Sequence, residues 1–197
     1  VDNIVAVDVK YGVKSIGSNA FSEFGTVDAG VTFSLPSSLV SIADNAFSGC
    51  QRLKSIELPN SLTTIGEGAF QECSALESVT LGSSVETIGA SAFNGTPISS
   101  ITIPASVKSI GKWAFADCTA LESVTFAEGS QLTSIGDNAF NYCNALESIA
   151  IPNSVTSIGE SAFEMCYGLV SATLSNSMET IPNSMFYECT GLKNITI

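Results

Sequence analysis

Apolar and polar residues alternate in one motif that recurs about eight times along the chain, and the segment LKSIELPNSLTTIGEGAFQEC at residues 53–73 represents it well. Residues 53–58 end in an apolar–polar alternation that predicts a short strand with one buried face. Pro59 lacks an amide proton and ends that strand. Leu62 and Ile65 return the chain to the core, and Gly66 opens a bend in which a residue without Cβ has conformational freedom. Residues 69–73 then predict a single helical or 3-10 turn with its apolar side inward.

A phenylalanine occupies the same position in every copy of the motif, and successive copies are 22 to 26 residues apart. These residues are Phe21, Phe47, Phe70, Phe93, Phe115, Phe140, Phe163 and Phe186. A fixed period of this length indicates a solenoid, in which no repeat buries its own hydrophobic face. We therefore expect an α/β repeat solenoid that forms a single domain over residues 1–197, with about eight repeats of 22–26 residues and a terminal strand.

Stacking of the repeats places equivalent residues in columns. We expect nine parallel strands about 4.8 Å apart, with the short helical or 3-10 turns on the opposite side. Outward-facing strand residues are mostly small and hydroxylated: Ser55, Glu57, Ser78, Thr80, Ser100, Thr102, Ser123, Thr125, Ser148, Ser171 and Thr173. Because this face lacks Trp, Tyr and Arg, a tight protein interface there would need anchors from its rims.

The repeat motif resembles the BspA-type class of bacterial leucine-rich repeats. The pattern L-x-x-I-x-I-P-x-S-V-x-x-I-G-x-x-A-F-x-x-C stands here at residues 146–166, and the similarity covers nearly the whole chain. The resemblance implies a curved right-handed superhelix with parallel strands on its concave face. It also implies a secreted or cell-surface protein that binds host matrix or cell-surface proteins, with no shared catalytic residues. Thr96 in place of Cys and Met185 in place of Ala are among the departures from the pattern.

The charge balance narrows the choice of partners. The chain has 7 basic and 19 acidic residues and a formal charge of −12, which disfavours nucleic acid and anionic membrane surfaces. It contains no apolar run of about twenty residues, so we expect no direct membrane insertion. No signal peptide is visible. Val1 opens the chain in mid-strand without a methionine, and we therefore expect a fragment of a longer protein.

Six cysteines fall three residues after the repeated phenylalanine: Cys50, Cys73, Cys118, Cys143, Cys166 and Cys189. Phe24 and Thr96 fill this position in the other two repeats, so the column is apolar and the thiols are expected to be free and buried. Disulfides between neighbouring coils are the alternative, although side chains on equivalent rungs point in parallel, which suits the disulfide torsion poorly. The chain has no histidine and no C-x-x-C pair, which argues against zinc, and we expect no cofactor.

The same absence of histidine excludes Ser-His and Cys-His nucleophile systems. Carboxylates recur at two positions of the repeat: Glu77, Glu122 and Glu147 at one, and Asp44, Glu67, Asp137 and Glu160 at the other. We interpret both columns as a solvated acidic edge. Ca²⁺ binding or catalysis by this edge is the alternative. We expect no enzyme.

Large apolar side chains replace small or polar ones at a few positions near the repeated turns: Trp113, Tyr142, Met165, Tyr167 and Tyr187. A cluster of this kind marks a candidate partner-binding surface. The first hypothesis is accordingly a non-catalytic adhesion or recognition module, and the alternative is a structural spacer that carries another domain. The bare strand Ile195–Ile197 also predicts end-to-end self-association, because an open edge can pair with another chain.

Overall fold

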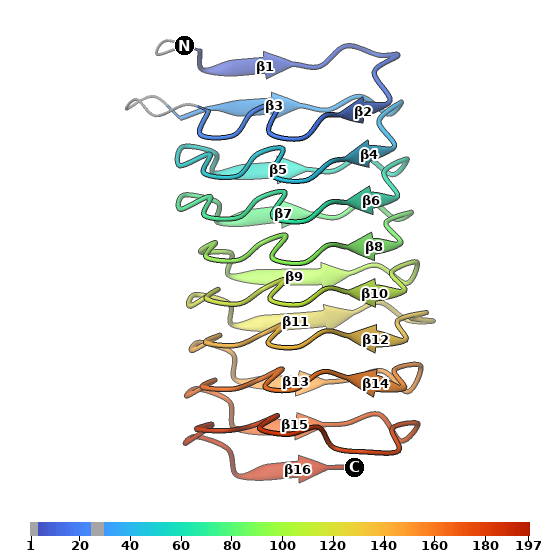
Figure 1. The fold of residues 1–197 in the computed structure, drawn as a ribbon, viewed down its shortest axis with the longest axis vertical. Helices are drawn as coiled ribbons and strands as arrows, with labels where there is room; N and C mark the ends of the chain where they lie inside the picture. Colours follow the sequence, from blue (N-terminus) through green and yellow to red (C-terminus); the bar gives the residue numbers. More distant parts are fainter. Residues whose placement is uncertain (1–3, 25–29) are drawn as a thin grey trace.

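The computed structural model, which describes residues 4–24 and 30–197, is a stack of coils in which the chain advances one level per repeat (Figure 1). The longer strands form one column with all described pairs parallel, as predicted. They are β1 (Ala6–Asp8), β3 (Thr32–Ser34), β5 (Ser55–Glu57), β7 (Ser78–Thr80), β9 (Ser100–Ile103), β11 (Ser123–Phe126), β13 (Ser148–Ala150), β15 (Ser171–Thr173) and β16 (Asn194–Thr196).

The register of this column follows the sequence repeat. Ser123 lies between Ser100 and Ser148 on the neighbouring strands, and Ile101 pairs with Val124. Strand residues alternate between exposed and buried along β5, β7 and β13. The predicted division into an inward apolar set and an outward hydroxyl set is therefore confirmed.

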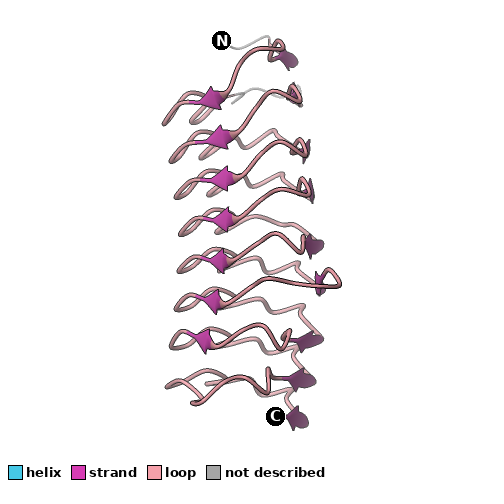
Figure 2. Ribbon diagram, turned by 90° about the vertical axis from the view of Figure 1, so that its right-hand side faces the viewer, coloured by secondary structure: helices cyan, strands magenta, loops and turns pink. Residues whose placement is uncertain are grey.

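A second column of short parallel strands was not predicted. It comprises β2 (Ser15–Ile16), β4 (Ser41–Ile42), β6 (Thr64–Ile65), β8 (Thr87–Ile88), β10 (Ser109–Ile110), β12 (Ser134–Ile135) and β14 (Ser157–Ile158), which form one seven-stranded sheet. The sequence had suggested only a return of the chain to the core at these residues. Figure 2 shows the two columns end-on, on opposite sides of the stack.

The predicted helical or 3-10 turns around the phenylalanines are wrong, since the described residues contain no helix. The backbone amides of this segment alternate between two kinds of partner. Phe70 donates to Ala92 of the next coil at 2.8 Å, Gln71 donates to Gly68 of its own coil at 3.0 Å, and Glu72 again donates to the next coil. Gly68 and Glu72 have φ of 58° and 57°. A left-handed residue at every fourth position interrupts the right-handed run that a helix needs and turns its own amide towards the next coil.

The eight repeated phenylalanines form one stacked column through the core. Successive ring centroids lie 5.1 to 5.8 Å apart, with interplanar angles of 1° to 19°. The six rings from Phe47 to Phe163 are fully buried. Each ring covers its neighbour's face, so every coil depends on the coils above and below it for burial, as the solenoid prediction required.

A glycine follows every short strand except β4, where Ala43 takes its place, and beyond the first coil this glycine is required by close packing rather than by conformational freedom. A Cβ on Gly111 would lie 2.5 Å from the backbone nitrogen of Ala90, whereas no left-handed φ is found there. The Gly111 amide donates to the carbonyl of Ile88 at 2.8 Å, which ties adjacent coils together.

Pro182 occupies this position in the last full coil and has no amide proton to donate. The second sheet correspondingly ends at β14, and Ile181 is 56% exposed.

Candidate functional site

Four of the five predicted partner-binding residues lie together in the last three turn segments. We call Tyr142, Met165, Tyr167 and Tyr187 the tyrosine patch. The Met165 amide donates to the Tyr187 carbonyl at 2.8 Å, and the Tyr167 amide donates to the Met165 carbonyl at 3.0 Å. Tyr142 occupies the position of Met165 one coil earlier, and its amide donates to the carbonyl of Glu164.

The three tyrosine rings of the patch reach solvent. Tyr142, Tyr167 and Tyr187 are 37%, 41% and 54% exposed, while Met165 is half-buried. Since all four come from the rigid ladder of turns, the patch presents amphipathic rings without an ordering cost for the backbone.

Two members of the patch adopt a left-handed backbone conformation. Tyr142 has φ of 58° and Met165 has φ of 57°. The fold imposes this conformation at that position, where Gly49 and Gly95 stand in other coils. Glu23, Glu72, Asp117 and Glu188 adopt the same conformation at this position of their coils, so the left-handed turn belongs to the repeat and is not particular to the patch.

Trp113 belongs to a different column from the tyrosines. It lies two residues before the buried Phe115 rather than after its phenylalanine, and its amide donates to the carbonyl of Asp137. Its φ is 60° and its side chain is half-buried. Trp113 therefore lies at a different position of the turn from the one that Tyr142 and Met165 share.

Carboxylates adjoin the tyrosines and change their titration. A hydrogen bond from the Tyr187 hydroxyl to Glu188 raises the pKa of Tyr187. Partial burial raises the pKa of Tyr167, and the nearby ionisable groups of Tyr142 and Glu188 raise it further. Both phenols stay protonated at neutral pH and can donate hydrogen bonds to a partner.

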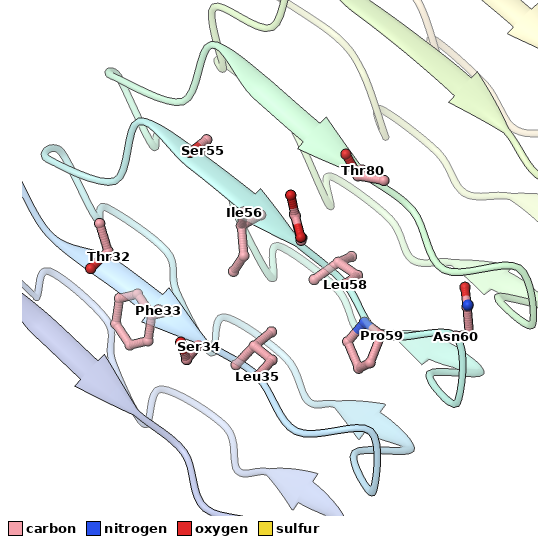
Figure 3. A pocket seen from close by; sticks show the side chains of 11 residues that line it. Thr32, Phe33, Ser34, Leu35, Ser55, Ile56, Leu58, Pro59, Asn60 and Thr80 are labelled. Atoms are coloured by element: carbon pink, nitrogen blue, oxygen red, sulfur yellow. The ribbon is translucent and has the colours of Figure 1, made fainter.

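The predicted strand-face residues are exposed, except that Ser171 is half-buried. They line three shallow hollows at places where neighbouring long strands lack a full ladder. The first hollow, about 570 Å³, lies between β3 and β5, where Val31 and Leu53 form an isolated bridge. Figure 3 shows its lining, with Phe33 and Leu35 from one coil and Ile56 and Leu58 from the next.

The other two hollows also lie where neighbouring long strands are incompletely paired. The strands β11 and β13 pair only at Ser123 and Ser148, and the longer turn at residues 128–130 lines the hollow of about 680 Å³ beside them. The hollow of about 430 Å³ lies beside β7 and β9, which belong to different sheets. The insertion at residues 128–130 thus shapes the strand face beside it.

One of the two acidic columns has a structural role. An Oδ1 of Asp44 accepts the amide of Glu67 at 2.9 Å, and Asp137 accepts the amide of Glu160 in the same way at 3.1 Å. Within residues 4–24 and 30–197, no three Asp, Glu, Cys or His side chains gather as a metal site would require. The interpretation as a solvated edge fits these contacts.

The six cysteines are free and buried, as predicted. Each also makes a contact that the sequence did not reveal, because its Sγ donates to the carbonyl of the phenylalanine one coil earlier. Cys73, Cys118, Cys143, Cys166 and Cys189 show Sγ to oxygen distances of 2.9 to 3.2 Å. Burial raises the pKa of Cys118 to about 12, so this thiol is poorly suited to nucleophilic chemistry.

A parallel-strand solenoid of about eight turns, tied by a phenylalanine column, defines a leucine-rich-repeat-like repeat protein. The chain belongs to the BspA type leucine rich repeat family, whose profile matches residues 1–122 and 118–197. No curated protein matches the chain. None of the described residues lies in a helix long and apolar enough to cross a membrane.

Solved structures of bacterial repeat proteins resemble this fold over most of the chain. A leucine rich cell surface protein of Faecalibacterium prausnitzii is 28% identical over 96% of this chain and 65% of its own, with a TM-score of 0.57. A leucine-rich repeat protein of Bacteroides ovatus is 30% identical over 97% of this chain and 63% of its own, with a TM-score of 0.61. The Leucine Rich Repeat protein of T. pallidum is 25% identical, covers 98% of this chain and 69% of its own, and has a TM-score of 0.61. The chain therefore spans less than two thirds of the first two proteins.

Proposed function

We propose that this chain is a non-catalytic protein-binding module of a bacterial surface protein and that it serves adhesion. The observation that carries the proposal is the tyrosine patch, with three rings 37% to 54% exposed on a rigid ladder of turns. Tyrosine dominates many protein interfaces because it adds a large amphipathic contact at a low entropic cost. The family supports a protein partner, and the F. prausnitzii relative is described as a cell surface protein.

The strand face supports binding less well than the patch does. Its side chains are small and hydroxylated, and its hollows are shallow openings between strands rather than enclosed cavities. Anchoring side chains such as Trp, Tyr and Arg are missing from it. The strand face would therefore add area to an interface that the patch anchors.

The test combines Tyr142→Ser, Tyr167→Ser and Tyr187→Ser in one variant. Binding to a panel of immobilised extracellular-matrix proteins is measured by surface plasmon resonance, with the thermal midpoint as the check on folding. Tyr11→Ser is the matched control, since Tyr11 is 82% exposed in the first coil, away from the patch. We expect the triple variant to lose binding at an unchanged midpoint and the control to retain it.

A structural spacer is the competing function, because a continuous ladder of coils also extends a neighbouring domain from a surface. If the unchanged chain binds none of the proteins in the panel, the spacer function is favoured. Binding that survives the triple variant would move the interface to the strand face.

A further inference from the structure

The tyrosine patch lies in a part of the chain that carries only negative charge. Residues 113–192 contain nine Asp and Glu residues and no Lys, Arg or His. All 7 basic residues of the chain lie outside this range, so carboxylates greatly outnumber basic groups in these coils. The turn that carries Trp113 marks the boundary, where Lys112 pairs with Asp137 at 3.6 Å.

Three carboxylates border the patch itself. Asp117 occupies the position of Tyr142 one coil earlier, and its amide donates to the carbonyl of Asn141 at 2.9 Å. Glu164 directly precedes Met165 and accepts the amide of Tyr142 through its backbone carbonyl, and its charge helps to raise the pKa of Tyr187. Glu188 directly follows Tyr187, and its carboxylate raises the pKa of the Tyr187 phenol.

Aromatic faces and carboxylates attract the same ligand. A ring quadrupole draws an ammonium or guanidinium group to its face, and a carboxylate pairs with the same group through charge-assisted hydrogen bonds. A partner with negative charge would meet an uncompensated field of like sign. Charge complementarity therefore selects a cationic occupant.

We propose that the tyrosine patch, together with the three carboxylates that border it, binds a protein segment rich in lysine and arginine. The inference rests on the protein-binding function proposed above and names the chemistry of the partner. Cationic side chains lie over the exposed rings, and their charged ends reach Asp117, Glu164 and Glu188.

The test uses a fluorescent peptide in which glycine alternates with lysine and arginine. A peptide of equal length with acetyl-lysine and citrulline in place of the cationic residues is the uncharged comparison. Anisotropy titrations at low salt compare the unchanged chain with a variant that combines Asp117→Asn, Glu164→Gln and Glu188→Gln. The matched control combines Glu67→Gln, Glu72→Gln and Glu77→Gln, which removes the same charge from coils outside the patch.

We expect the patch variant to bind the cationic peptide about tenfold more weakly, because three partly exposed charge contacts together amount to about 1.4 kcal/mol. The control variant should change the affinity less than about twofold. Equal weakening by the two variants would show a diffuse attraction and overturn the proposal. Equal affinity for the uncharged peptide would also overturn it.

A competition experiment separates this inference from the broader function. If a matrix protein binds through the tyrosines and excess cationic peptide displaces it, both proposals are supported. If excess cationic peptide fails to displace the matrix protein, and the tyrosine variant still loses binding to that protein, the protein-binding function stands. The proposal of a cationic partner is then overturned.

Discussion

The Sγ of Cys143 donates a hydrogen bond to the backbone carbonyl of Phe115, one coil earlier, at 3.2 Å. The same contact recurs in the neighbouring coils. The cysteine thiols therefore link successive coils by hydrogen bonds, in addition to packing in the core as small apolar side chains. Thr96, which occupies the cysteine position of its coil, donates instead to the carbonyl of Phe93 in its own coil at 2.8 Å, so the ladder between coils is interrupted there.

Cys143→Ala should therefore destabilise the protein more than Cys143→Ser. Alanine removes the donor and leaves a small void, whereas serine keeps a donor close to the carbonyl. We expect a difference of about 1 kcal/mol in the free energy of unfolding, the usual net contribution of a hydrogen bond. Chemical denaturation measures the free energy of unfolding of both variants. Equal losses of stability would mean that the thiol contributes only apolar packing and no hydrogen bond.

Gly111→Ala should be among the most damaging small substitutions in the chain. Its Cβ would lie 2.5 Å from the backbone nitrogen of Ala90, so adjacent coils would have to separate. We expect a loss of about 3 kcal/mol, at the upper end for overpacking of a core. Gly17→Ala is the matched control, because Gly17 holds the same position in the first coil and its Cβ would meet nothing within 4 Å. A similar loss in both variants would contradict the close-packing argument.

Glu72→Gly should stabilise the protein, although glycine usually weakens a folded chain. Glu72 has φ of 57°, where a side chain costs about 1–2 kcal/mol. The added freedom of glycine in the unfolded chain costs about 0.5–1 kcal/mol. We expect a net gain of about 0.5–1 kcal/mol, measured as a rise in the thermal midpoint of a few degrees. The exposed Glu77 has no left-handed φ, so Glu77→Gly should lower the midpoint, and a rise there would refute the assignment of the effect to backbone conformation.

The stability that Cys118 contributes should depend on pH. Burial raises the pKa of its thiol from 9.0 to about 12, so the folded state holds the proton more tightly than the unfolded state does. The contribution is complete below pH 9 and is lost as the pH rises towards 12, with a slope of at most about 1.4 kcal/mol per pH unit.

The free energy of unfolding of the unchanged chain and of Cys118→Ala, measured across this range, checks the prediction. The difference between the two should be constant near neutral pH and shrink above pH 9. A difference that stays constant throughout would mean that the thiol ionises equally in both states.

The sequence by itself determined the solenoid, the nine long strands and their register. The reason is that the eight phenylalanines and the Ile–Ser alternation repeat with a nearly fixed period, and equivalent residues of stacked coils must pack against one another. The buried cysteine column followed from the same periodicity. The residues of the tyrosine patch could be named in advance because each departs from the common residue at its position.

Only the tertiary structure decided how those residues are arranged and what each turn looks like. The second sheet depends on the amide of Gly111 reaching the carbonyl of Ile88, a contact between residues that belong to different repeats. The turns form no helix because Gly68 and Glu72 are left-handed, and their amides find partners in the next coil. Sequence spacing fixes the column to which a residue belongs, but contacts between coils fix which columns adjoin and which side chains reach solvent.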